Sequence, residues 1–283
     1  MLEKESPKIL VTDLDGTLFY PKRKITLIPK KSIEFLQDFI DKGNKVVVAS
    51  GRNFEFGKKV AKKLNRKIDF FGCNGMLIYK ENNKIFEKAF VYEEIKAYLD
   101  NVLEKFEPTT FAIMTDKHNL IVCPLKYRFM MRIGYPIWAN SQGVYKEPYK
   151  LVNKDTFNNI LKSDKIYKVM IFFGLGKKAV SKATIVATYL RKHYDLYEAS
   201  SSSISIELTP KGINKGEAID IYLKNSPELD KDKVYVVGDS GNDVPMFRKY
   251  YENSFCMSHS RSGVQKNAKN IIDSFSDLKN YLS

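Results

Sequence analysis

Short apolar runs alternate with amphipathic stretches over the first 72 residues of the chain. The runs at 8–12, 46–50 and 68–72 are each followed by polar or glycine-containing residues, which predicts buried strands ending in loops. Residues 30–42 carry apolar positions spaced as one helix face, and the basic stretch 53–65 is predicted as a second helix. Strands and helices that alternate with short connections predict a parallel sheet in an α/β domain.

The pattern changes after residue 76. The elements predicted there are a hairpin over 77–90, helices over 92–105 and 178–193, and strands over 168–173 and 204–208. Between 105 and 168 the periodicity is mixed, and we expect short strands and turns. This composition of elements predicts a separate α+β domain over 89–208.

The α/β pattern returns near the C-terminus. A helix over 215–224 follows Asn214, a good N-cap, and Glu217 stands at the capping-box position. Strands at 234–237 and 254–257, a helix at 243–250 and a final helix complete the chain. The fold class is therefore predicted as α/β, with a Rossmann-like parallel-sheet core split into residues 1–88 and 209–283 and an inserted domain between them.

Composition and charge narrow the class of protein. The chain has 283 residues, of which 43% are hydrophobic and 28% charged, so a disordered or collagen-like chain and a small disulfide scaffold are excluded. The net charge of +14 raises the question of a nucleic-acid partner. Its densest cluster lies on and just after the predicted helix 53–65, without aromatic platforms or a recognisable module beside it; it comprises Lys58, Lys59, Lys62, Lys63, Arg66 and Lys67. We therefore interpret the excess as solvated surface and expect no nucleic-acid partner.

The lack of recognisable targeting segments and the pattern of cysteines favour a cytoplasmic location. No apolar run approaches the roughly 20 residues that a membrane span needs, and the first residues lack the apolar region of a signal peptide. Cys73, Cys123 and Cys256 are far apart and form no metal-binding pair, which is typical of free thiols in a reducing compartment.

Polar residues that chemistry could use follow three of the predicted core strands. Asp13 and Asp15 follow the first strand, Ser50 ends the second, and Asp239 and Asp243 follow a late one. In open α/β sheets, ligands bind outside the carboxyl ends of the strands, so we expect these groups to share one crevice.

This grouping suits a cation and a phosphate group. Clustered carboxylates repel one another unless a cation is present, and Mg²⁺ prefers oxygen ligands. Lys215, at the start of a predicted helix, could offset phosphate charge, and Ser50 beside Gly51 could donate to phosphate oxygens. An aspartate could also serve as a nucleophile. Each of these features alone is more often a helix cap, a turn or a solvated residue, but their order along the chain strengthens the functional interpretation.

The sequence resembles the haloacid dehalogenase superfamily of phosphatases. Four motifs occur in the superfamily's order: DLDGTL at 13–18, SGR at 50–52, Lys215 within GINKG at 212–216, and GDSGND at 238–243. Only 34 residues separate Asp15 from Ser50, but 164 separate Ser50 from Lys215. This spacing resembles the Cof-type class IIB, which carries an α/β cap after the second motif. One departure is the sequence CMSH at 256–259, where relatives often carry Ala-Met-Gly-Asn; we interpret His259 as a loop residue.

The resemblance implies a role for each matching residue. Asp13 would be the nucleophile that carries the phosphoryl group, and Asp15 the general acid and base. The implied Mg²⁺ ligands are Asp13, the backbone carbonyl of Asp15 and Asp239, with Asp243 as a support or as a ligand through water. The implied phosphate-binding residues are Ser50, Gly51, Lys215 and Asn242. Two roles stay open for Arg52, a contact with the substrate and an ion pair.

The resemblance also implies a substrate class and leaves alternatives open. The expected reaction is Mg²⁺-dependent hydrolysis of a small phosphorylated metabolite, such as a sugar phosphate, with the cap choosing the leaving group. A sugar phosphomutase is the first alternative, because such mutases share the motifs. A non-enzymatic regulatory or nucleic-acid-binding protein on the same fold is the second. Nothing in the sequence predicts the oligomeric state.

Overall fold

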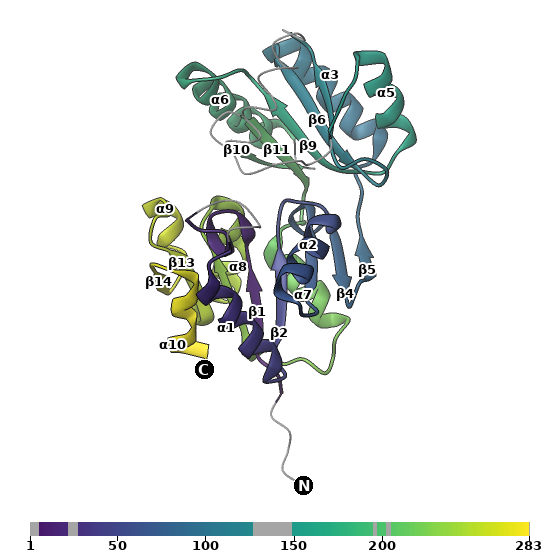
Figure 1. Ribbon diagram of the computed structural model, residues 1–283. Coiled ribbons are helices and arrows are strands. Elements are labelled where there is room, and N and C mark those ends of the chain that lie inside the picture. The colour runs from purple at the N-terminus through teal and green to yellow at the C-terminus, as the bar shows by residue number, and fades with distance from the viewer. Residues whose placement is uncertain (1–5, 22–27, 127–148, 195–196, 202–204, 283) are drawn as a thin grey trace. The chain divides into compact units, whose positions relative to one another are not determined.

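The computed structural model describes residues 6–21, 28–126, 149–194, 197–201 and 205–282. The chain divides into two compact units (Figure 1). The first, hereafter the core unit, combines Met1–Glu87 with Ile213–Ser283, and the second, the inserted unit, is Lys88–Gly212. Within the described residues, no helix is long and apolar enough to cross a membrane.

An eight-stranded sheet forms the centre of the core unit. Its strands, in spatial order, are β14 (Asn270–Ile272), β13 (Ser254–Met257), β12 (Val234–Gly238), β1 (Ile9–Thr12), β2 (Lys45–Ala49), β3 (Asp69–Gly72), β4 (Leu77–Lys80) and β5 (Asn83–Glu87). The first six run parallel to one another, whereas β4 pairs antiparallel with β3 and forms the predicted hairpin with β5 at one edge. The chain passes from β1 to β2 on one side, whereas β12 pairs with β1 on the other.

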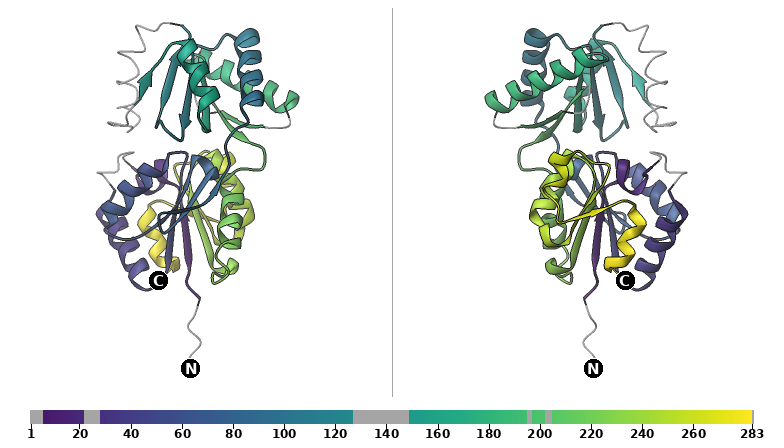
Figure 2. Two further views of the ribbon diagram at one scale, coloured as in Figure 1. Left: turned by 90° about the vertical axis from the view of Figure 1, so that its right-hand side faces the viewer. Right: turned by 90° about the vertical axis from the view of Figure 1, so that its left-hand side faces the viewer.

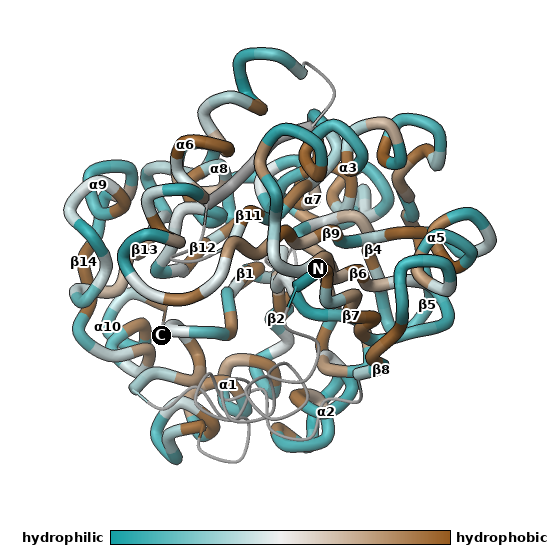
Figure 3. The backbone as a smooth tube through the Cα atoms, turned by 90° about the horizontal axis from the view of Figure 1, so that it is seen from above, coloured by the Kyte–Doolittle hydropathy of each residue, from teal (hydrophilic) through white to brown (hydrophobic). Residues whose placement is uncertain are grey.

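Helices cover both faces of this sheet (Figure 2). Those of the core unit are α1 (Lys30–Asp41), α2 (Phe54–Leu64), α7 (Lys215–Lys224), α8 (Val244–Lys249), α9 (Ser262–Gln265) and α10 (Lys279–Leu282). Residues of α1, α2 and α10 pack against one face, and residues of α7 and α8 against the other. Along these helices hydrophobic and hydrophilic residues alternate (Figure 3), as expected where one side is buried and the other exposed.

Burial on both faces explains the continuous apolar runs of the central strands. On β1, Leu10 enters the layer with α1 and α2, whereas Ile9 and Val11 enter the layer with α7 and α8. On β2, Val46 and Val48 alternate with Val47 in the same way. Strands of this kind are typical of parallel sheets between two helical layers.

The start of α7 bears on the site described below. Asn214 caps the helix as predicted, because its side chain accepts a hydrogen bond from the Glu217 backbone amide at 3.0 Å. The capping box expected from Glu217 is not formed. Its carboxylate instead accepts a hydrogen bond from Lys249 of α8 at 2.9 Å, which joins the two helices.

The inserted unit has its own sheet and its own helical layer. Its six strands, in order, are β10 (Tyr197–Ser201), β11 (Ser205–Pro210), β9 (Ile166–Phe172), β6 (Thr110–Thr115), β7 (Ile121–Pro124) and β8 (Lys150–Leu151). The helices α3 (Tyr92–Phe106), α5 (Lys154–Ser163) and α6 (Lys177–His193) cover one face of this sheet (Figure 1). Most pairs are antiparallel, and β7 pairs with β8 in parallel.

The predicted fold class, a parallel α/β core with an α+β insertion, is confirmed. Some elements were predicted incompletely. The helix α5 and the strand β14 were missed, whereas the predicted final helix is present as α10. Ile204, placed in a predicted strand, lies outside the described residues.

Candidate active site

The first two functional carboxylates follow neighbouring strands. Thr12, the last residue of β1, is in register with Val237 of β12, and the Asp13 backbone amide donates to the Val237 carbonyl at 2.9 Å. Asp13 and Asp239 therefore leave the same edge of the sheet side by side. Because the chain runs to opposite sides from these two strands, this edge is the switch point at which ligands of open α/β sheets bind.

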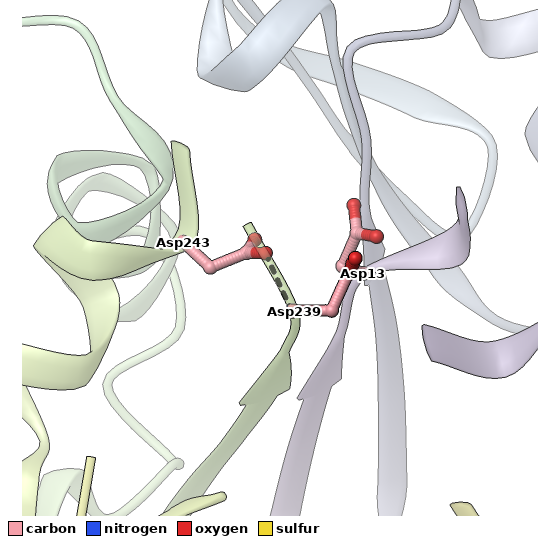
Figure 4. A group of neighbouring side chains, drawn as sticks. All are labelled: Asp13, Asp239 and Asp243. Atoms are coloured by element: carbon pink, nitrogen blue, oxygen red, sulfur yellow. Dashed lines mark hydrogen bonds between the residues drawn. The ribbon is translucent and has the colours of Figure 1, made fainter. Parts of the chain in front are cut away.

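Asp243 completes a group of three carboxylates (Figure 4). Asp13, Asp239 and Asp243 each offer one oxygen, and these oxygens all lie within 4.8 Å of one another. Asp13 and Asp243 are buried, and Asp239 is half-buried. Three carboxylates at this spacing form the kind of donor set that suits Mg²⁺.

The loop after β12 holds Asp243 in place. One oxygen of Asp243, Oδ2, accepts hydrogen bonds from the backbone amides of Asp239 and Ser240, both at 2.9 Å. The bond to Asp239 is the dashed line in Figure 4. A Cβ on Gly238 would lie 2.4 Å from the carboxyl carbon of Asp243, so only glycine leaves room for this loop. Asn242, from the same loop, donates to the Asn74 side chain at 3.2 Å.

Lys215 lies among these carboxylates. It is the first residue of α7 and is fully buried. Its Nζ atom lies 2.5 Å from Asp13 Oδ1 and 2.6 Å from Asp243 Oδ1. Burial on its own lowers the pKa of Lys215, but the charges of Asp13 and Asp243 outweigh it and raise the pKa above its usual range. Lys215 is therefore a fixed positive charge in the site.

The charge balance of the cluster favours a bound cation. Burial raises the pKa of Asp13 well above its ordinary value, and the charge of Lys215 counteracts this only in part. The carboxylates of Asp243, Asp239 and Asp15 raise the pKa further. A buried negative charge is costly unless it is paired. A divalent cation would supply the missing positive charge, so the donor set and the electrostatics both fit Mg²⁺.

Asp15 lies apart from the three grouped carboxylates and pairs with Arg52. Arg52 Nε donates to Asp15 Oδ2 and Nη2 donates to Asp15 Oδ1, both at 2.7 Å. The guanidinium also lies over the Phe56 ring, 4.2 Å from its centroid. Of the two alternatives for Arg52, the structure has the ion pair, and its partner is the predicted acid–base residue.

Ser50 and Gly51 follow β2, the strand next to β1. Ser50 is buried, and its hydroxyl accepts a hydrogen bond from the Arg52 amide at 3.2 Å. Its carbonyl accepts from the Asn74 amide at 3.0 Å, which ties this loop to the loop after β3. The structure thus places Asp13, Ser50 and Asp239 after three adjacent strands, as the sequence predicted for one sheet edge.

Sequence reasoning missed several neighbours of these residues. Thr17 Oγ1 donates to Asp239 Oδ1 at 3.1 Å, although Thr17 was noted only as part of a motif. The ring of Tyr20 stacks on that of His259, and His259 Nε2 lies 3.7 Å from Asp239 Oδ2. The departure from the usual motif at 256–259 was the only signal that could have pointed to His259.

The sequence matches a known protein family. Residues 10–278 match the family described as haloacid dehalogenase-like hydrolase. The chain belongs to this family. The resemblance seen in the four motifs is thereby confirmed, and the match spans both units.

Individual relatives support the same assignment. The Mycoplasma genitalium protein MG265 is 26% identical over 274 residues, which cover 94% of this chain and 92% of its own length. The Bacillus subtilis protein YwtE, named a 5-amino-6-(5-phospho-D-ribitylamino)uracil phosphatase, is 25% identical over 85% of this chain and 84% of its own length.

Solved structures share the fold. A Streptococcus mutans protein, SMU.1108c, superposes with a TM-score of 0.78 at 19% identity, over 98% of this chain and 99% of its own. The subclass IIB sugar phosphatase BT4131 gives a TM-score of 0.74 at 21% identity, over 97% and 98% of the two chains. The predicted enzyme class, a phosphatase of the haloacid dehalogenase type, is confirmed by the family and its named members. The non-enzymatic alternative is therefore set aside.

Proposed function

We propose that the protein is a Mg²⁺-dependent phosphatase that hydrolyses a small phosphorylated metabolite through an aspartyl-phosphate intermediate. The observation that carries the proposal is the buried contact of Asp13 with Lys215, beside the carboxylates of Asp239 and Asp243. Such a site combines a fixed nucleophile with the positive charge that phosphoryl transfer requires.

The first half of the reaction forms the covalent intermediate. An oxygen of Asp13 attacks phosphorus, the bond between phosphorus and the ester oxygen breaks, and Asp15 gives its proton to the departing alcohol. Lys215, Ser50 and Asn242 are proposed to hold the transferring phosphoryl group, together with the backbone at Gly51. The contacts of Lys215 with Asp13 and Asp243 keep its ammonium group beside the nucleophile.

The second half returns the enzyme to its starting state. Asp15, now ionised, takes a proton from a water molecule that attacks phosphorus. The bond between phosphorus and Asp13 breaks, inorganic phosphate leaves, and the carboxylate of Asp13 is regenerated. One residue thus acts first as an acid and then as a base.

Asp13, the backbone carbonyl of Asp15, Asp239 and Asp243 would hold the Mg²⁺ ion. When bound, the ion supplies positive charge that stabilises the phosphoryl oxygens in the transition state. Asp243 is already oriented for this role by two backbone amides.

The inserted unit is proposed to be the cap that selects the leaving group. Its described residues form an α+β unit with a buried core of its own, inserted between the second and third motifs. A sugar phosphate or a related phosphate ester is the proposed substrate class. The names of two similar proteins, a phosphoribitylamino-uracil phosphatase and a sugar phosphatase, support this class.

A panel of phosphorylated metabolites tests the proposal. Purified protein should release phosphate from p-nitrophenyl phosphate and from at least one sugar phosphate in the presence of Mg²⁺, and chelation should abolish the activity. Asp13→Asn should lower kcat at least about 1000-fold because the nucleophile is lost. Asp38→Asn, at an exposed position of α1, is the matched control and should retain the parent rate.

Two results would contradict this account. If folded Asp13→Asn hydrolyses p-nitrophenyl phosphate at the parent rate, Asp13 is not the nucleophile. If a sugar phosphate is isomerised faster than it is hydrolysed, and only with a bisphosphate activator, the protein is a phosphomutase. The cytoplasmic location predicted from the scattered cysteines stays a prediction; all three are buried thiols outside any disulfide.

A further inference from the structure

His259 and Tyr20 join two loops beside the candidate metal site. His259 follows β13, and Tyr20 follows the first motif after β1. Their rings are stacked, with centroids 4.0 Å apart and planes 6° from parallel. Two strands, β13 and β1, lie on either side of β12, so the stacked pair brackets the strand that leads to Asp239.

The carboxylate of Asp239 is enclosed by these loops. Thr17 donates to its Oδ1 atom at 3.1 Å, and a Cβ on Gly16 would lie only 2.3 Å from its Oδ2 atom. His259 Nε2 lies 3.7 Å from the same Oδ2 atom. This separation exceeds the longest ordinary N–H···O hydrogen bond by roughly 0.5 Å, so a small rotation of either side chain forms the bond.

We propose that His259 is a positioning residue that orients the carboxylate of Asp239 for the cation. The inference rests on the proposed function, because the cation is the one assigned to the same three carboxylates. Stacking on Tyr20 fixes the plane of the imidazole and so directs Nε2 toward Asp239 Oδ2. Thr17 on Oδ1 and His259 on Oδ2 then restrict rotation of the carboxylate.

The chemistry of metal sites supports this role. Some side chains hydrogen-bond to a metal-binding carboxylate without touching the metal. Their removal commonly lowers metal affinity by 10- to 100-fold. A histidine is suited to this task because one flat ring offers both a stacking face and a directed nitrogen. The loop residue expected from the sequence at this position therefore has a specific contact with the site.

Direct metal binding tests the proposal without relying on catalysis. The dissociation constant for Mn²⁺, used as a spectroscopic probe, is measured by electron paramagnetic resonance on the full-length protein. His259→Phe keeps the stacking on Tyr20 but lacks the nitrogen, and it should weaken Mn²⁺ binding about tenfold. His259→Gln, which restores a donor without the stacking ring, should bind Mn²⁺ more tightly than His259→Phe. His118→Phe, in the inserted unit, is the matched control and should not change the constant.

The outcomes separate this inference from the proposed function. If His259→Phe, with parental thermal stability, binds Mn²⁺ as tightly as the parent, or if the parent protein binds no Mn²⁺, the inference is wrong. If His259→Gln binds Mn²⁺ no more tightly than His259→Phe, a packing role suffices and the inference is also overturned. If the constants change as expected but the parent hydrolyses no phosphate ester, the proposed function fails and the positioning role stands.

Discussion

Arg52 determines where the carboxylate of Asp15 lies. Two charge-assisted hydrogen bonds in a fork hold the carboxylate in one orientation, and contact with the Phe56 ring holds the guanidinium. Lysine cannot reproduce this geometry, because its ammonium group is a single point of charge. Arg52, to which the sequence assigned no single role, thereby positions the carboxylate of Asp15.

Arg52→Lys should therefore impair proton transfer. We expect kcat to fall about tenfold or more for an alkyl phosphate, whose leaving alcohol needs a proton, and less for p-nitrophenyl phosphate, whose leaving group does not. Steady-state kinetics with both esters check the difference. Arg66→Lys is the matched control, because Arg66 makes the same forked contact with Asp41 at an exposed place outside the four motifs. An equal loss for both esters would argue against a role of Arg52 in proton transfer.

Single residues were predictable where a motif fixed their type and spacing. Asp13, Asp239 and Lys215 were placed at one edge of the sheet from the sequence, and they lie there. The partners of His259 and Arg52 were not predictable, because each contact joins loops more than 30 positions apart and no local pattern encodes the pair.

At the scale of elements, the tight turn after β1 depends on Gly16. Its φ of +92° lies in the left-handed region, and an added Cβ would lie 2.3 Å from Asp239 Oδ2. The turn thus brings the backbone directly against the carboxylate proposed to bind the cation. Gly43 has a similar φ of +88°, but an added Cβ there would meet no atom within 4 Å.

These two glycines form a matched pair for mutation. Both Gly16→Ala and Gly43→Ala should lower the free energy of unfolding by about 1 kcal/mol, because alanine is strained at positive φ. Only Gly16→Ala should also displace Asp239, and a displacement of this kind typically lowers kcat about 100-fold. Chemical denaturation and phosphatase assays measure the two effects. Parental activity in Gly16→Ala would show that the close approach is not required.

Elements were predictable to the extent that their apolar period was clear. The buried strands and amphipathic helices of the core unit match the predicted ranges within about two residues. The helix α5 was missed because it buries only Phe157 and Leu161, too few positions to mark a helical period. The strand β14 was missed because it has three residues, and its pairing with β13 is a long-range contact.

At the scale of the whole molecule, the two units differ in how the chain builds them. The inserted unit is one continuous segment, whereas the core unit needs two segments. The central strand β1 pairs with β2 from its own segment and with β12 from the other. The first segment alone therefore lacks the partner of its most buried strand, and it also lacks α7 and α8.

Fragments should behave accordingly. Residues 88–212 expressed alone should fold, with dispersed NMR spectra and cooperative thermal unfolding. Residues 1–87 alone should remain unfolded or aggregate, because one edge of β1 and one face of the sheet are uncovered. Mixing fragments 1–87 and 213–283 is the control and should restore some ordered structure. A folded, monomeric 1–87 fragment would contradict this view of the core.

The central claim is that Asp13 carries the phosphoryl group, and trapping this group tests it most directly. Asp15→Asn should slow hydrolysis of the intermediate more than its formation from p-nitrophenyl phosphate, so the intermediate accumulates. Rapid acid quenching, reduction with borohydride and mass spectrometry then locate the modified residue. The account predicts homoserine at position 13, formed from the aspartyl phosphate. Release of p-nitrophenol with an unmodified Asp13, or a modification at another residue, would contradict it.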